Sequence, residues 1–274
     1  MRSTHRIASG RATLAAEVVG SGGPVVFLHA RVADRRMWRE QLVGVGAHNK
    51  AIAYDRRGFG ETRFEKEDFS AVEDLMAVID VTANDEPVIL VGCSQGGGIV
   101  IDAALRYPSR VRALVLIAPN VTGAPEGIHP PRIEALLTQL KEAEKMGDLD
   151  KAMAIRTCLS LDGPLEAEGR ITGWARQLFF DMNAVALRSP PTGANLDTAS
   201  AYHRLGEIFA PSLVICGDLD IPNTRERCRY SATTVLNGSY HELSGVAHLP
   251  SLEQPADITN LLTEFIDRCS GRQV

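Results

Sequence analysis

The stretch from Pro87 to Gly98, PVILVGCSQGGG, restricts the fold of this chain more than any other part of the sequence. Val88–Val91 is short, apolar and rich in β-branched residues, which predicts a strand buried on both faces. Glycines stand two positions before and two positions after Ser94, and the apolar run Ile99–Leu105 has helical spacing. This G-x-S-x-G spacing predicts a sharp strand-to-helix turn that exposes the serine hydroxyl. The alternative is a glycine-rich turn that only packs the helix on the strand or cradles a phosphate.

Short apolar runs and helical patterns alternate along both ends of the chain. The runs predict strands at residues 11–20, 25–28, 51–54, 88–91, 111–117, 212–216 and 240–243. Between them, helical spacing is found at residues 34–45, at the end of the chain at 255–268, and after the capping-box signature Ser70–Glu73. Alternation of this kind is typical of a parallel sheet with helices on both faces.

The middle of the chain breaks this alternation. Residues 121–205 contain no convincing strand, but residues 132–145, 148–159 and 170–182 have helical spacing. We therefore expect three parts. Residues 1–120 and 206–274 form an α/β core, and residues 121–205 form a helical insertion, which we interpret as a cap.

Composition and charge limit the class of protein, the partners and the cellular location that we expect. The chain has 274 residues, which fits one large α/β domain or a domain with an insertion, and its 45% hydrophobic and 23% charged residues are ordinary for a soluble globular protein. A net charge of −5 without a basic cluster argues against a nucleic-acid partner. No apolar stretch is long enough to span a membrane, and the first ten residues lack the apolar segment of a secretory signal. The five cysteines have no metal-like spacing, so we expect buried thiols in a cytoplasmic protein.

Three chemically complementary side chains follow predicted strands, in the order serine, acid, histidine. They are Ser94, Asp220 and His248. In a parallel sheet, functional groups gather at the carboxyl ends of the strands. A serine is a weak nucleophile until a base removes its proton, and a histidine titrates near neutral pH. An acid that accepts a hydrogen bond from the other ring nitrogen would orient the histidine.

With these motifs the sequence resembles the α/β-hydrolase family over nearly its whole length. The resemblance rests on the strand end His29-Ala30, the loop Asp55–Gly60, the Gly92–Gly96 turn, Gly217–Asp220 and the loop Gly245–Glu253. It implies a mostly parallel sheet of about eight strands flanked by helices, with a helical cap. It also implies that Ser94, Asp220 and His248 form a catalytic triad. We prefer Asp220 to its neighbour Asp218 and His248 to His241, which lies inside the last predicted strand.

The resemblance further implies an oxyanion hole made by the backbone N–H groups of Gln95 and Arg31. Here the sequence departs from the family pattern, because Ala30 stands where a glycine is usual before the donor residue. The Arg31 side chain has two interpretations, a guide for a carboxylate-bearing substrate or a solvated surface arginine. By the same resemblance, Asp55 and Arg57 brace their loop near the active site. Separately, we expect a structural role for His29, which would bond local backbone groups.

A looser match, to 3-oxoadipate enol-lactonases and related carboxylic-ester hydrolases, does not name a substrate. It rests on Ala33–Trp38, Asp55–Thr62 and Leu161–Pro164. We expect a serine hydrolase of small esters or lactones that needs no metal or organic cofactor and is a monomer or small homo-oligomer. A serine nucleophile disfavours the haloalkane dehalogenase and epoxide hydrolase branches. A cofactor-free perhydrolase or haloperoxidase, a C–C bond hydrolase and a receptor-type protein with little turnover stay open as alternatives.

Overall fold

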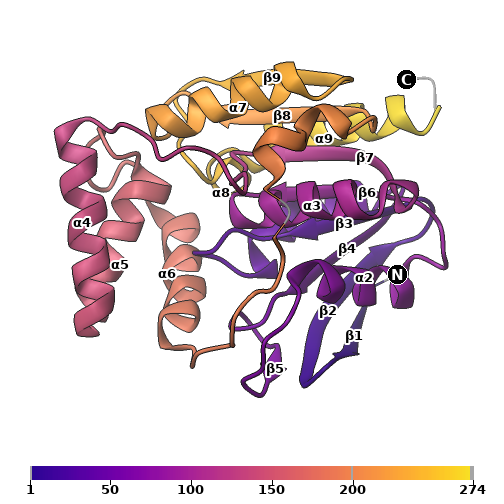
Figure 1. The fold of residues 1–274 in the computed structure, drawn as a ribbon, viewed down its shortest axis with the longest axis horizontal. Coiled ribbons are helices and arrows are strands. Elements are labelled where there is room, and N and C mark those ends of the chain that lie inside the picture. The colour runs from indigo at the N-terminus through magenta and orange to yellow at the C-terminus, as the bar shows by residue number, and fades with distance from the viewer. Residues whose placement is uncertain (1, 199, 272–274) are drawn as a thin grey trace.

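A single twisted sheet organises the computed structural model, which describes residues 2–198 and 200–271 (Figure 1). Within these residues the sheet has nine strands, in the order β1-β2-β4-β3-β6-β7-β8-β9, with β5 paired to β2. The pairings of β2 with β1, β4 and β5 are antiparallel, and the others are parallel. The strand bounds are β1 Arg2–Ser9, β2 Ala12–Gly20, β3 Pro24–Leu28, β4 Lys50–Asp55, β5 Arg63–Phe64, β6 Val88–Cys93, β7 Val111–Ile117, β8 Ser212–Gly217 and β9 Gly238–Leu243.

Helices cover both faces of the sheet and bury a separate apolar cluster on each. On one face lie α2 (Ala71–Thr82), α3 (Gln95–Arg106) and α7 (Pro222–Thr234), which contribute Leu75, Ile101 and Cys228 to the first cluster. On the other face lie α1 (Arg39–Val45), preceded by the short turn η1 (Arg35–Trp38), and α9 (Pro255–Cys269), preceded by α8 (Pro250–Glu253). The central strand β6 is buried along its whole length because both clusters pack against it.

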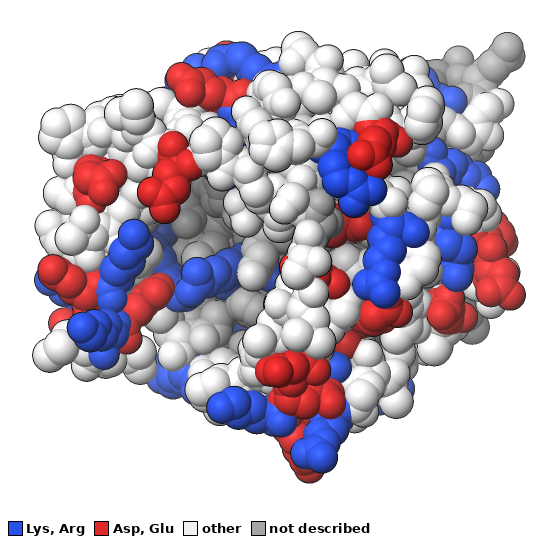
Figure 2. All heavy atoms as spheres, viewed as in Figure 1, with Lys and Arg blue, Asp and Glu red and all other residues white. Residues whose placement is uncertain are grey.

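Between β7 and β8 the chain forms a group of helices beside the sheet (Figure 1). They are α4 (Pro131–Met146), α5 (Leu149–Thr157), the single π-helical turn η3 (Cys158–Asp162) and α6 (Gly173–Arg188), and the turn η4 (Ala201–Glu207) leads back to β8. In the space-filling view the surface is hollowed between this group and the sheet, and Lys and Arg atoms lie at the hollow (Figure 2).

The structure confirms the predicted α/β-hydrolase architecture and corrects its details. The sheet has two more strands than the seven named from the sequence, β1 and β5. β1 is an edge strand whose side chains are mostly exposed, so it lacks an apolar run, and β5 is only two residues long. Helix α7 was not predicted either, because few of its residues are buried.

The boundaries proposed for the core and the insertion stay predictions, and Met1, Ala199 and residues 272–274 within them lie outside the described residues. All five cysteines lie in the described part of the chain and are free thiols. None of the described helices is both long and apolar enough to cross a membrane.

Candidate active site

Ser94 lies at the sharp turn between β6 and α3, as the glycine spacing predicts. Its backbone has φ 52° and ψ −114°, a sparsely populated conformation that costs roughly 1–3 kcal/mol when a residue with a side chain adopts it. The turn closes only because the flanking residues are small. A Cβ on Gly92 would lie 2.6 Å from the Gly96 carbonyl oxygen, and one on Gly96 would lie 2.5 Å from the Leu28 carbonyl oxygen. The fold therefore holds the serine at the N-terminus of α3, where backbone N–H groups have no helical partner.

Asp220 and His248 meet across the ends of β8 and β9. The Asp220 carboxylate is buried, and its Oδ2 lies 2.7 Å from His248 Nδ1. Its other oxygen, Oδ1, accepts a hydrogen bond of 2.7 Å from the Ile221 N–H. Burial by itself lowers the pKa of His248, but the Asp220 charge and hydrogen bond outweigh it and raise the pKa above its ordinary value. A histidine held in this way has Nε2 free to exchange a proton.

The loop that carries His248 is fixed by a buried carboxylate. Both Glu253 side-chain oxygens accept from the Ala247 N–H, at 3.1 and 3.0 Å. Glu253 also forms an ion pair with Arg170, which donates to the Gly245 carbonyl at 3.0 Å. Arg170 lies between η3 and α6, so the helical segment and the histidine loop share this brace. Sequence reasoning missed Arg170, because a single arginine among many gives no signal of its position.

One cavity of about 280 Å³ brings the predicted site residues together. Ser94, Gln95, His248 and Arg31 all line it, although they come from three separate parts of the chain. Asp220 lies behind His248, as its hydrogen bond to the ring shows. Four of the five residues selected from the sequence therefore line this one cavity, and the fifth, Asp220, contacts His248. The residues that complete the lining are Ala118, Pro119, Asn120, Thr224 and Arg227.

The rival candidates lie elsewhere. Asp218 accepts hydrogen bonds from the Gly245 N–H at 2.7 Å and the Ser244 hydroxyl at 3.2 Å, so it braces a turn. His241 pairs with Ile215 within the sheet and does not line the cavity. His29 is buried, and its Nε2 accepts from the Arg56 N–H at 3.1 Å. These placements agree with the structural role expected for His29 and with the preference for Asp220 over Asp218.

The Arg31 side chain is 64% exposed and lies 3.7 Å from a Glu144 carboxylate oxygen on α4. This exposure favours a solvated surface arginine over a guide for the substrate, although Arg31 also lines the cavity. Arg57 and Asp55 are braces. Arg57 binds Asp74 at 2.8 Å and also pairs with Glu67, and Asp55 pairs with Arg35.

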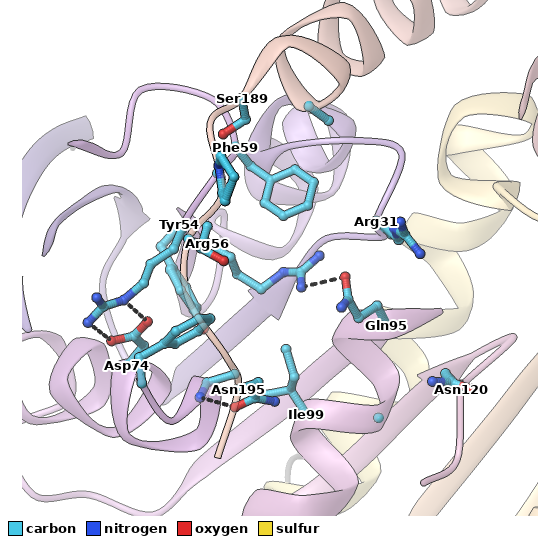
Figure 3. A pocket seen from close by; sticks show the side chains of 18 of the residues that line it. Arg31, Tyr54, Arg56, Phe59, Asp74, Gln95, Ile99, Asn120, Ser189 and Asn195 are labelled. Carbon is cyan, nitrogen blue, oxygen red and sulfur yellow. Dashed lines mark hydrogen bonds and ion pairs between the residues drawn. The ribbon is translucent and has the colours of Figure 1, made fainter. Parts of the chain in front are cut away.

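A larger cavity of about 450 Å³ adjoins the first, since Arg31, Gln95 and Asn120 line both. Figure 3 shows that Arg56 extends past Phe59 toward Gln95 in this second cavity. Arg56 Nη1 donates to the Gln95 Oε1 at 2.9 Å. Sequence reasoning missed Arg56, because the loop Asp55–Gly60 reads as a solvated charged loop and only the fold shows which arginine is buried.

Comparison with known proteins agrees with this fold. Residues 25–261 match the model of the alpha/beta hydrolase family, and the chain belongs to this family. Relatives include epoxide hydrolase 2 of Siraitia grosvenorii, which is 26% identical over 91% of this chain and 93% of the relative. The pimeloyl-[acyl-carrier protein] methyl ester esterase of Nitrosospira multiformis is 23% identical over 90% and 95% of the two chains. Among solved structures, a malate-bound thermophilic esterase from Thermogutta terrifontis superposes with a TM-score of 0.76, at 22% identity over 98% and 99% of the chains.

With esterases and hydrolases among both its relatives and its structural neighbours, the protein is a hydrolase of this family.

Proposed function

We propose that this hydrolase cleaves small carboxylic esters or lactones through an acyl-enzyme on Ser94. The observation that carries the proposal is the 2.7 Å contact between Asp220 and His248, with the His248 ring in the same cavity as Ser94. Nucleophile, base and orienting acid are the three parts that serine acyl transfer requires. A serine at the turn, in place of a carboxylate, favours acyl transfer over the opening of an epoxide ring.

In this mechanism His248 Nε2 takes the Ser94 proton while Oγ attacks the substrate carbonyl carbon. The Nδ1–H keeps its hydrogen bond to Asp220, which stabilises the imidazolium as it forms. The backbone N–H groups of Gln95 and Arg31 receive the developing oxyanion. His248 then returns the proton to the leaving alcohol oxygen. A water molecule, deprotonated by the same ring, attacks the acyl carbon and regenerates the serine.

Residues 121–205 serve as the cap in this proposal. Ala186 and Ser189 of this segment line the adjoining 450 Å³ cavity, and Arg31, which lines both cavities, forms an ion pair with Glu144 of α4. The pimeloyl-[acyl-carrier protein] methyl ester esterase, by its name, acts on a methyl ester, which is consistent with the proposed substrate class. The cytoplasmic location and the monomeric or small oligomeric state stay predictions.

The test compares wild type with Ser94→Ala and His248→Ala on p-nitrophenyl acetate and butyrate. We expect each substitution to lower kcat by about 10⁴–10⁶ without loss of the fold, because the three residues act as a unit. Ser244→Ala is the matched control, since it removes an exposed hydroxyl that donates to Asp218 and does not line the cavity. A purified, folded Ser94→Ala protein with near wild-type turnover would overturn the proposal.

A further inference from the structure

Arg56 is a buried cation without an anionic partner. The residue is only 7% exposed, yet no ion pair in the described part of the chain includes it. Arginines are rarely buried unless a carboxylate or phosphate pairs with them. Burial accordingly lowers the pKa of Arg56 to about 10, below its ordinary value. The fold keeps an unpaired positive charge at this place, although a neutral side chain would avoid the desolvation penalty.

The contacts of Arg56 leave part of its guanidinium unused. Nη1 donates to Gln95 Oε1 at 2.9 Å, and Nη2 donates to the His29 carbonyl at 3.0 Å. Its Nε–H has no partner. The Phe59 ring lies against the guanidinium, 4.7 Å from its carbon to the ring centroid. Two of five N–H groups are therefore engaged by neutral acceptors, and a planar donor set of this kind suits a carboxylate.

His29 does not neutralise this charge. Its Nδ1 lies 2.8 Å from the Ala30 carbonyl oxygen and donates to it, while Nε2 accepts from the Arg56 N–H. Both ring nitrogens are thus occupied in the neutral form. Burial, followed by the nearby charge of Arg56, holds the pKa of His29 well below its ordinary value.

The other charged side chains that line the 450 Å³ cavity are already paired or turned to other partners. Arg57 and Asp74 pair with each other, and Arg31 lies near Glu144. Asp102 accepts a hydrogen bond from the Thr122 hydroxyl at 3.1 Å, and burial raises its pKa to about 6. Asp102 forms no ion pair either, but it is an acid. Among the cations that line the cavity, Arg56 is thus the one to which the described residues supply no carboxylate.

We propose that Arg56 binds a carboxylate of the substrate, so that the protein acts on esters or lactones that carry a second, free carboxylate. The inference rests on the proposed function of Ser94. Gln95 links the two sites, because it directly follows the nucleophile and its side chain accepts from Arg56. Gln95, Arg31 and Asn120 line both cavities, so an elongated molecule can place its ester at Ser94 and its carboxylate at Arg56 (Figure 3). Monoesters of short dicarboxylic acids have this shape.

The competing explanation gives Arg56 a purely positioning role, in which it holds Gln95 so that the backbone N–H faces the oxyanion. That role predicts an equal loss on charged and neutral esters. Carboxylate binding predicts a loss confined largely to the charged ester. The ratio of kcat/KM for the charged ester to kcat/KM for the neutral ester therefore distinguishes the two explanations.

The kinetic test measures kcat/KM by proton release for monomethyl adipate and for methyl hexanoate, which share a six-carbon acyl chain and differ in the carboxylate. Wild type is expected to prefer monomethyl adipate, and Arg56→Met to reduce that preference about 10- to 100-fold, the usual effect of losing a charge-assisted contact. Arg112→Met, an exposed arginine at the start of β7, is the matched control and keeps the preference. If Arg56→Met does not fold, Arg56→Gln replaces it with the same expectation. A wild type without preference, or an equal loss on both esters, overturns the inference.

A binding test separates this inference from the proposed function. Adipate is titrated into Ser94→Ala and into Ser94→Ala/Arg56→Met by calorimetry, where no hydrolysis is needed. Binding that is lost with Arg56 and weakened by salt supports the carboxylate site even if no ester is turned over. Binding that is absent, or equal in both variants, overturns it even if Ser94 proves to be the nucleophile.

Discussion

The substitution Asp220→Asn tests how the buried acid controls His248. The two carboxylate oxygens have different partners, and this difference decides how an asparagine would sit. Oδ1 accepts from the Ile221 N–H, so the asparagine carbonyl oxygen is expected to keep that bond. The asparagine NH₂ would then point at His248 Nδ1, where Oδ2 now lies 2.7 Å away. An NH₂ donor there stabilises the ring tautomer with its proton on Nε2.

The expected loss has two parts. Removing a hydrogen bond to a charged group is worth about 1.5–3 kcal/mol, which corresponds to roughly 10- to 150-fold in rate. The wrong tautomer adds to this loss, because a protonated Nε2 cannot accept the Ser94 proton. Together we expect kcat/KM to fall by about 10⁴. Asp218→Asn, which changes the rival acid two residues away, is expected to cost less than about tenfold, since only a turn loses its charge.

The pH profile supplies a second readout. Activity requires neutral His248, so in wild type it is lost as pH falls through the raised pKa of that ring. Without the Asp220 charge, burial, the largest influence on the ring, lowers its pKa, so the acid limb of kcat/KM moves to lower pH. The assay is kcat/KM for p-nitrophenyl butyrate between pH 5 and pH 9, on variants whose fold is checked by circular dichroism. An acid limb at the same or higher pH, or a loss below tenfold, would refute the reasoning.

Three further substitutions test the framework of the site. Gly96→Ala places a Cβ 2.5 Å from the Leu28 carbonyl oxygen, so urea unfolding should show a loss of about 1–3 kcal/mol or more, whereas Gly206→Ala, whose nearest neighbour is 3.8 Å away, should be nearly neutral. Arg57→Met leaves the buried Asp74 unpaired and should lower the free energy of unfolding by about 3–5 kcal/mol, and adding Asp74→Leu should recover part of it; equal losses in both variants would contradict the pairing. The folded-state pKa of Asp102, about 6, lies above its unfolded value, so the contribution of Asp102 to stability should fall as pH rises from about 4 to 6. Asp102→Asn should remove that portion of the pH dependence, and an unchanged stability profile would exclude Asp102 as its source.

Much of the site could be predicted because local constraints and functional groups coincide. Only small residues at positions 92 and 96 allow the turn at Ser94, so the two glycines in the sequence predict the turn. Asp220 and His248 follow strands β8 and β9, whose order in a parallel sheet brings their ends together. Five of the strands found, β3, β4, β6, β7 and β8, are buried along nearly all of their length, whereas β2 and β9 were found although they are less buried. The strands missed, β1 and β5, owe their existence to pairing with β2 rather than to their own composition.

The side chains that lie beyond the predicted five residues could not be found in this way. Arg56 and Arg57 are adjacent in sequence and identical in type. One is neutralised by Asp74 and the other has no anionic partner in the described chain, a difference that depends on α2 and α3 packing at either side of the loop. Arg170 gains its role only because its helical segment meets the histidine loop. The roles of these arginines depend on contacts between segments that are distant in the sequence, and the periodicity of apolar residues does not predict such contacts.

The central claim is that Ser94 becomes acylated during turnover. The most direct measurement is the intact mass of the protein after reaction with a fluorophosphonate, followed by peptide mapping of the modified residue. The account predicts one adduct on Ser94 in wild type, formed with loss of p-nitrophenyl butyrate hydrolysis, and no adduct in Ser94→Ala. Labelling at another residue with the same loss of activity, or full activity in a protein labelled at Ser94, would contradict it.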